Sequence, residues 1–328
     1  MTEEITEPLT PTSIASRSAL VAPLLHEYLP VTPLVRFGAL SDELGAEVLV
    51  KCEHLQVTGS FKARGALAKA LTLTDEQRAQ GVVTASTGNH GLGVANAVAR
   101  LGGRCMVFVP ENASASKVAA LRRFGAEIRS IGTDSGLLEI MARESAAEHG
   151  LTYIPPYNDA DVIAGQGTVG VEIVEQIGDL GLDAVFVSVG GGGLISGTAS
   201  VLRQYLPDIR VVGASPTLDP AMYASVQAGE VVKVDGLPTL SDGTAGNLEV
   251  GSVTVDLCRD LVDEWVLVDE VDIKAALRSV IDTEHVLVEG SAAVAFAAAR
   301  AATVAGQRVA VVSCGANISS DTLAVALT

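Results

Sequence analysis

Lys62 stands in a local setting that suits covalent chemistry. It follows Phe61 in the segment TGSFKARG (58–65), where small and apolar residues surround it. A surface lysine has a pKa of about 10.4 and is a poor nucleophile, whereas a partly desolvated lysine loses its proton more readily and can form a Schiff base. We therefore expect Lys62 to bond an aldehyde. The alternative is an ordinary solvated lysine near a helix start.

A run of four glycines is the second chemical element. Gly190, Gly191, Gly192 and Gly193 follow an apolar strand pattern and precede Leu194, where a helical pattern begins. Backbone N–H groups approach an anion closely only where no Cβ intervenes, and a helix N-terminus adds favourable partial charge. The run predicts a phosphate-binding loop rather than a tight turn without a ligand. A reactive lysine together with a phosphate loop indicates pyridoxal 5′-phosphate as the cofactor.

Further motifs follow in an order that is typical of one family. The matching blocks are Thr32-Pro33-Leu34, residues 51–56 (KCEHLQ) leading to Lys62, residues 85–91 (ASTGNHG), residues 161–168 (DVIAGQGT), the four glycines and residues 313–317 (SCGAN). From about Thr32 to Ser319 the chain resembles the serine/threonine dehydratase family of fold-type II pyridoxal-phosphate enzymes, which also contains serine racemase. Any one block could arise by chance, but the ordered set is specific.

The resemblance implies roles for the first two site segments. Lys62 would hold the cofactor as a Schiff base and later remove the α-proton of the substrate, and Phe61 would pack beside the cofactor. Asn89 would hydrogen-bond the cofactor 3′-hydroxyl and, with Ser86, Thr87 and His90, would face the amino-acid substrate. From the residues alone, Phe61 is equally a core residue.

Residues 86–91 precede an apolar helical pattern from Leu92 to Leu101. Backbone N–H groups at such a helix start can hold a substrate carboxylate. Simple N-capping by Ser86 or Thr87 is the alternative, and both can hold at once. Thr87 stands where serine racemase-type relatives carry a serine that protonates the opposite face of the substrate carbanion, so the resemblance implies racemisation as a side activity.

Cys314 aligns with the serine or cysteine that contacts the pyridine nitrogen in the resembled family. A thiol is a weak hydrogen-bonding partner, so it need not hold that nitrogen protonated. A less electron-poor ring favours expulsion of a β-leaving group over transamination. Ser313 could take the same role after a shift of one residue.

Two other positions have open interpretations, and one differs from the family. Glu289 precedes Gly290 at a predicted helix start, where stabilisation of the helix dipole is the favoured interpretation. Asn158 would face the cleft by resemblance or simply form a turn. Many relatives bind a divalent cation through a glutamate where this chain has Ser215, so we predict no metal site.

The chain around these motifs predicts an α/β protein with largely parallel sheets. The runs 105–109, 184–189, 211–214 and 309–313 are apolar throughout, as expected for strands covered by helices on both faces. The resemblance implies a fold like that of the tryptophan synthase β subunit, with two open, twisted, mostly parallel sheets flanked by helices. We expect a small substrate-binding domain at 82–158 inserted into a large cofactor-binding domain formed by 1–81 and 159–328.

Composition narrows the class of protein and its partners. The 328 residues carry a formal net charge of −17, which disfavours docking onto nucleic acid or an anionic membrane. The four cysteines are widely spaced and the N-terminus lacks the pattern of a signal peptide, so we expect a cytoplasmic protein. The resemblance implies a homodimer. The chain ends soon after the Cys314 block, so we expect no C-terminal regulatory domain and a catabolic role.

The sequence therefore predicts a lyase that converts L-threonine or L-serine to a 2-oxo acid and ammonia by α,β-elimination of water. Three alternatives stay open. The first is a dehydratase for another β-hydroxy amino acid, such as a 3-hydroxyaspartate or a hydroxyectoine-derived substrate, because residues 220–248 and 85–91 also resemble hydroxyectoine-utilisation dehydratases. The second is a serine racemase-like enzyme, and the third is a non-catalytic binding module on this scaffold.

Overall fold

The structure, a computed structural model, describes residues 9–132 and 135–328. Its larger sheet has the strand order β1-β2-β10-β7-β8-β9, in which β1 is antiparallel to β2 and every other pairing is parallel. The strands of this sheet are β1 (Leu34–Arg36), β2 (Glu47–Lys51), β7 (Ala184–Ser188), β8 (Arg210–Pro216), β9 (Glu264–Val268) and β10 (Arg308–Val312). Three of the four predicted apolar runs, 184–189, 211–214 and 309–313, form its centre, whereas the run 105–109 lies in the smaller sheet. The predicted α/β class with mostly parallel sheets is confirmed.

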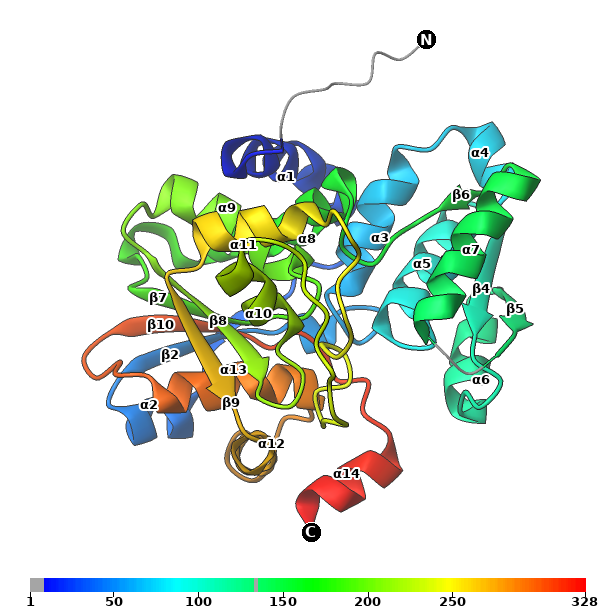
Figure 1. Cartoon of the computed structure of the whole chain (residues 1–328). Coiled ribbons are helices and arrows are strands. Elements are labelled where there is room, and N and C mark those ends of the chain that lie inside the picture. Colours follow the sequence, from blue (N-terminus) through cyan, green and yellow to red (C-terminus); the bar gives the residue numbers. More distant parts are fainter. Residues whose placement is uncertain (1–8, 133–134) are drawn as a thin grey trace.

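The smaller sheet has the order β5-β4-β3-β6 and is parallel throughout. Its strands are β3 (Val82–Ala85), β4 (Cys105–Val109), β5 (Glu127–Ser130) and β6 (Thr152–Tyr153). All four fall within 82–158, and Figure 1 shows this sheet and its helices beside the larger one. The domain boundaries stay a prediction, because Leu67, which precedes residue 82, shares a core cluster with Val98 and Val107 of the smaller unit.

Helices flank both sheets. Those around the larger sheet are α1 (Pro11–His26), α2 (Gly38–Leu44), α8 (Ala160–Ile177), α9 (Gly193–Tyr205), α10 (Ala221–Ala228), α11 (Val253–Leu261), α12 (Glu270–Glu284), α13 (Gly290–Ala301) and α14 (Ser320–Leu327). Those nearer the smaller sheet are α3 (Lys62–Leu71), α4 (Asp75–Gln80), α5 (Asn89–Arg100), α6 (Ala115–Arg123) and α7 (Ser135–His149). Two 3₁₀ turns are η1 (Glu53–Leu55) and η2 (Gly178–Leu180). In residues 9–132 and 135–328 no helix is long and apolar enough to cross a lipid bilayer.

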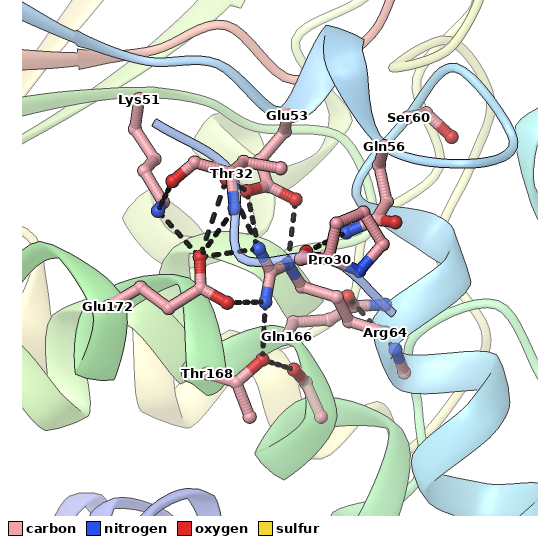
Figure 2. A network of polar contacts seen from close by, with 12 residues as sticks. Pro30, Thr32, Lys51, Glu53, Gln56, Ser60, Arg64, Gln166, Thr168 and Glu172 are labelled. Atoms are coloured by element: carbon pink, nitrogen blue, oxygen red, sulfur yellow. Dashed lines mark hydrogen bonds and ion pairs between the residues drawn. The ribbon is translucent and has the colours of Figure 1, made fainter. Parts of the chain in front are cut away.

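A fully buried ion network fixes the first turn of α3 (Figure 2). Arg64 of α3 contacts Glu53 at 2.7 Å and Glu172 of α8 at 2.6 Å, and Lys51 at the end of β2 contacts Glu172 at 2.6 Å. Burial alone would raise the pKa of Glu172, but hydrogen bonds and charges from Arg64 and Lys51 hold it at about 2. Two cations thus balance two carboxylates, and the network anchors the helix that begins at Lys62.

Candidate active site

Lys62 begins α3 with its amine inside the protein. Its Nζ donates a hydrogen bond to the Pro156 carbonyl at 2.8 Å and lies 5.2 Å from the centre of the Phe61 ring. Burial lowers the pKa of Lys62 to about 8, against the opposing negative charge of Glu139. Because this pKa lies well below the usual lysine value, a sizeable share of the amine is neutral and nucleophilic near pH 8.

The glycine run forms the turn between β7 and α9. Gly192 has a φ of 82°, in the left-handed region that favours glycine, and it is the N-cap of α9. A Cβ at Gly190 would lie 2.7 Å from Thr244 Cα, and one at Gly191 would lie 2.2 Å from the Tyr157 ring. Side chains are thus excluded here, and the backbone N–H groups at the start of α9 stay accessible to an anion.

One cavity brings the lysine and the glycine loop together. It holds about 470 Å³ of space that is free of protein atoms, open solvent included. The predicted cofactor-binding residues on its wall are Phe61, Lys62, Asn89, Gly190, Gly191, Gly192, Gly193, Leu194 and Cys314. The remaining lining residues are Tyr157, Ser188, Gly243, Thr244, Glu289 and Ser291.

Cys314 lies next to the lysine segment, just beyond the end of β10. Its carbonyl accepts a hydrogen bond from the Phe61 N–H at 3.1 Å, and its thiol is buried in the cavity wall. Burial raises the pKa of the thiol well above its usual value, and the nearby charge of Glu289 adds to this rise. Ser313 instead lies 2.8 Å from the His54 ring and is absent from the cavity wall. The geometry therefore favours Cys314 over Ser313.

Of the four predicted substrate-facing residues, only Asn89 is on the cavity wall. Ser86 accepts a hydrogen bond from the Gly88 N–H at 3.1 Å, and Gly88 is the N-cap of α5. His90 donates from Nε2 to the Ile154 carbonyl at 2.9 Å, and burial lowers its pKa to about 3. Ser86, the half-buried Thr87 and His90 thus frame the start of α5. Their substrate contacts and catalytic roles stay predictions.

Glu289 has another role in the structure than the stabilisation of a helix dipole that its sequence position favours. It is the N-cap of α13, yet its side chain makes no capping hydrogen bond. The carboxylate instead accepts hydrogen bonds from Asn89 Nδ2 at 2.8 Å and from the Asn317 N–H at 2.9 Å. The sequence offers one signal for this site, since Asn317 closes the SCGAN block, but nothing in it pairs Glu289 with Asn89.

Tyr157 lines the cavity in place of Asn158. Asn158 turns away and bonds Glu249 at 3.1 Å through its amide nitrogen. The Tyr157 hydroxyl accepts a hydrogen bond from the Glu249 N–H at 2.8 Å, which holds the ring against the glycine loop. No pattern in the sequence predicted that the Tyr157 ring lies beside the glycine loop.

The wall of the cavity fits pyridoxal phosphate. The amine of Lys62 can bond an aldehyde, the glycine loop leaves space where any side chain would intrude, and the neutral thiol of Cys314 lies on the same wall. An independent comparison decides the matter, because the model of the pyridoxal-phosphate dependent enzyme family matches residues 26–315. The chain belongs to this family. The prediction of pyridoxal phosphate as the cofactor is confirmed for this pyridoxal-phosphate enzyme.

Individual relatives of this pyridoxal-phosphate enzyme are similar over most of its length. It is 39% identical to the L-threonine ammonia-lyase of Geobacter sulfurreducens, over 90% of this chain and 73% of that protein. It is 36% identical to the biosynthetic L-threonine dehydratase of Haemophilus influenzae, over 91% of this chain. The chain spans only 58% of the length of the Haemophilus relative.

A solved structure of another protein has a similar fold. The processed form of threonine deaminase isoform 2 from Solanum lycopersicum superposes with a TM-score of 0.90 and 34% identity, over 95% of this chain and 92% of that chain. The predicted fold-type II architecture of this pyridoxal-phosphate enzyme, with two mostly parallel sheets flanked by helices, is therefore confirmed.

Proposed function

We propose that this enzyme is an ammonia-lyase that converts L-threonine or L-serine to the corresponding 2-oxo acid and ammonia. One observation carries the proposal, namely that Lys62, half-buried and with its pKa lowered to about 8, lies in the same cavity as the glycine loop. The names of the relatives, an L-threonine ammonia-lyase and an L-threonine dehydratase, support this choice of substrate.

The residues divide the work by their chemistry. When bound, pyridoxal phosphate supplies an aldehyde that bonds amines and a conjugated ring that accepts the electron pair released at the substrate α-carbon. The N–H groups of the glycine loop bind and orient the phosphate. Lys62 Nζ takes the proton from the α-carbon of the substrate, since a base with a pKa near the working pH is both free and strong enough. The start of α5 orients the substrate carboxylate.

Cys314 favours elimination over other outcomes. Because burial keeps its thiol protonated, this wall of the cavity presents a weak neutral partner instead of a carboxylate. A weak partner would not hold the pyridine nitrogen of the cofactor in its positively charged form. Loss of the β-hydroxyl would then compete well with return of a proton to the substrate α-carbon. The product enamine then tautomerises to an imine, which water hydrolyses to the 2-oxo acid and ammonia.

The test is to supply L-threonine and L-serine separately to the purified enzyme and to measure 2-oxo acid and ammonia. We expect stoichiometric release from at least one of them, and no turnover in Lys62→Ala. Normal turnover in Lys62→Ala would contradict the assigned role of Lys62. Exchange of the α-hydrogen in D₂O without release of oxo acid would identify a racemase instead.

Two alternatives become distinct outcomes of the same assay. Turnover of a 3-hydroxyaspartate or a hydroxyectoine-derived amino acid, but not of threonine or serine, would move the substrate to another β-hydroxy amino acid. Binding of amino acids without any turnover by the cofactor-loaded protein would identify a binding module.

We also propose that the enzyme is a cytoplasmic homodimer. The four cysteines are all free and buried, as expected for a protein kept in a reducing compartment. The dimer rests on the family resemblance alone. Light scattering during size-exclusion chromatography would measure the mass directly, and a monomeric mass would contradict it.

A further inference from the structure

Three side chains form a closed hydrogen-bonded group, which we call the Asn89–Glu289–Asn317 triad. Asn89 Nδ2 donates to Glu289 at 2.8 Å, Asn317 Nδ2 donates to Asn89 Oδ1 at 2.6 Å, and the Asn317 N–H donates to Glu289 at 2.9 Å. Asn89 begins α5 of the smaller unit, whereas Glu289 and Asn317 flank α13 and β10 of the larger one. The triad therefore joins the two units at the wall of the cavity.

The triad fixes which end of the Asn89 amide faces each neighbour. An ionised carboxylate only accepts hydrogen bonds, so Glu289 can meet only the NH₂ end of Asn89. One N–H of this NH₂ group goes to Glu289, and the other has no partner among the residues that the structure describes. Because Asn89 lines the cavity, this second N–H is a donor for a cofactor oxygen.

The same triad holds the segment that leads into Lys62. Asn317 Nδ2 also donates to the Thr58 carbonyl at 2.8 Å, and a Cβ on Gly59 would lie 2.7 Å from Asn317 Oδ1. The Thr58 carbonyl can only accept, so it fixes the orientation of the Asn317 amide, which in turn presents its NH₂ group to Asn89. The orientation of Asn89 is thus set from two sides.

Glu289 is an unusual partner because little positive charge surrounds it. It is 3% exposed, and burial followed by repulsion from Asp242 raises its pKa to about 7. The hydrogen bonds from Asn317 and Asn89 and the charge of Lys117 act in the opposite direction. The other titratable groups that interact with it across the cavity are Lys62 and Cys314.

We propose that Glu289 is a positioning residue, whose ionised carboxylate fixes the amide of Asn89 so that an N–H group faces the cofactor and makes cofactor binding dependent on pH. Both oxygens of Glu289 accept from N–H donors, so protonation of either oxygen weakens one bond of the triad. The inference rests on the proposed contact between Asn89 and the cofactor, but it does not depend on which amino acid is the substrate.

The test measures binding of pyridoxamine 5′-phosphate to the apoenzyme by fluorescence titration between pH 5.5 and 8.5. This probe keeps the ring and phosphate of the cofactor but has no aldehyde, so titration of Lys62 as a nucleophile does not enter. We compare wild type with Glu289→Gln at each pH, which cancels titration of the probe itself. Loss of a charged hydrogen-bond partner predicts wild type to bind about tenfold more tightly at pH 8.5. The ratio should approach one at pH 5.5.

A double-mutant cycle separates positioning from a general effect on the fold. If Glu289 acts through Asn89, Glu289→Gln should change the affinity by less than about twofold in an Asn89→Ala background. Glu284→Gln is the matched control, because its carboxylate also accepts from a backbone N–H, that of Leu40 at 3.0 Å, but lies outside the cavity wall. If Glu289→Gln does not fold, Glu289→Asp replaces it, since the shorter side chain keeps the charge and cannot span the same two bonds.

Three results would overturn the inference. They are an equal loss of affinity in the wild-type and Asn89→Ala backgrounds, a ratio that does not vary with pH, and a wild-type apoenzyme that does not bind the probe. Binding of the probe with the expected ratio, but without release of oxo acid from threonine or serine, would reject the proposed substrates and leave the role of Glu289 intact.

Discussion

Two buried polar clusters of this enzyme shift the pKa of a glutamate in opposite directions. Around Arg64, two cations and two carboxylates neutralise one another, and the pKa of Glu172 is held at about 2. In the triad, Glu289 has amide partners instead of a cation in contact, and its pKa is raised to about 7. The depressed pKa keeps Glu172 ionised over the whole physiological range, whereas the carboxylate of Glu289 titrates within it.

The location of each cluster matches this difference. The charged residues of the Arg64 network are absent from the cavity wall, whereas Glu289 lies on it. The ion pairs of Arg64 therefore position α3, which begins at Lys62. The titratable carboxylate of Glu289 instead contacts Asn89, which is proposed to bind the cofactor.

The largest effect should come from Arg64→Met. This change leaves the carboxylates of Glu53 and Glu172 buried without their main partner, and breaking a buried pair in this way costs about 3–5 kcal/mol. Urea unfolding of the apoenzyme measures it. Arg308→Met is the control, because its pair with Glu47 is partly exposed and should be worth about 1 kcal/mol or less. Equal losses in the two variants would show that the buried network has no special weight.

The next effect is a pH dependence of opposite sign in the two clusters. Glu289 titrates at about 7 when folded and near 4.5 when unfolded, so the folded state binds its proton more tightly between these values. The free energy of unfolding should therefore fall by about 3 kcal/mol as the pH rises from 4.5 to 7. The contribution of Glu172, whose folded pKa is depressed, is instead lost as the pH falls from 4.5 towards 2.

The difference in stability between wild type and Glu289→Gln isolates the first of these slopes. Thermal unfolding of both apoproteins at pH 5 and pH 8 should show wild type losing more stability than the variant. A difference that stays constant with pH would mean that Glu289 does not titrate in this range.

A smaller effect is expected from Gly59→Ala. Gly59 has a φ of 74° and a Cβ there would meet Asn317, so the change adds backbone strain of about 1–2 kcal/mol and disturbs the triad. Gly125→Ala is the matched control, because Gly125 has a φ of 77° but no atom within 4 Å of a built Cβ. Both variants should lose stability in urea, but only Gly59→Ala should also bind pyridoxamine 5′-phosphate more weakly. If both variants bound pyridoxamine 5′-phosphate with the same affinity, the change at Gly59 would not act on cofactor binding through the triad.

The smallest effect should come from Arg143→Gln. Arg143 pairs with Glu249 at 2.8 Å across partly exposed side chains, and such pairs contribute about 0.2–1 kcal/mol. Thermal unfolding at low and high salt measures it, and the difference from wild type should shrink as salt is added. A loss comparable to that of Arg64→Met would contradict the distinction between exposed and buried pairs.

The sequence predicted the features that local pattern determines. The apolar strand runs, the glycine turn and the placement of Lys62 before a helix all depend on residues near one another in the chain, and the structure has them within one or two residues. Cys314 was placed by the family resemblance, at the end of the predicted strand 309–313. These features carry the cofactor-binding part of the site.

Long-range pairing could not be predicted in the same way. Arg64 meets Glu172 across 108 positions and Asn89 meets Glu289 across 200, and no local pattern records such distances. The helix start at Glu289 even favoured a different interpretation, because an acidic residue at an N-cap is a common local signal. Which carboxylates are neutralised, and therefore which one titrates, depends on the tertiary fold alone.

The hydrogen bond from Lys62 to the Pro156 carbonyl has a structural consequence. Pro156 lies in the connection from β6 to α8, where the chain passes from the smaller sheet back to the larger one. A neutral amine that condenses with an aldehyde loses both of its hydrogens in the water that leaves, so Lys62 Nζ bonded in this way could donate to the Pro156 carbonyl only if it were protonated. An unpaired carbonyl is unfavourable, so without that donor the Pro156 carbonyl would need another hydrogen-bond partner. Occupation of Lys62 would therefore change a hydrogen bond in the connection between the two sheets.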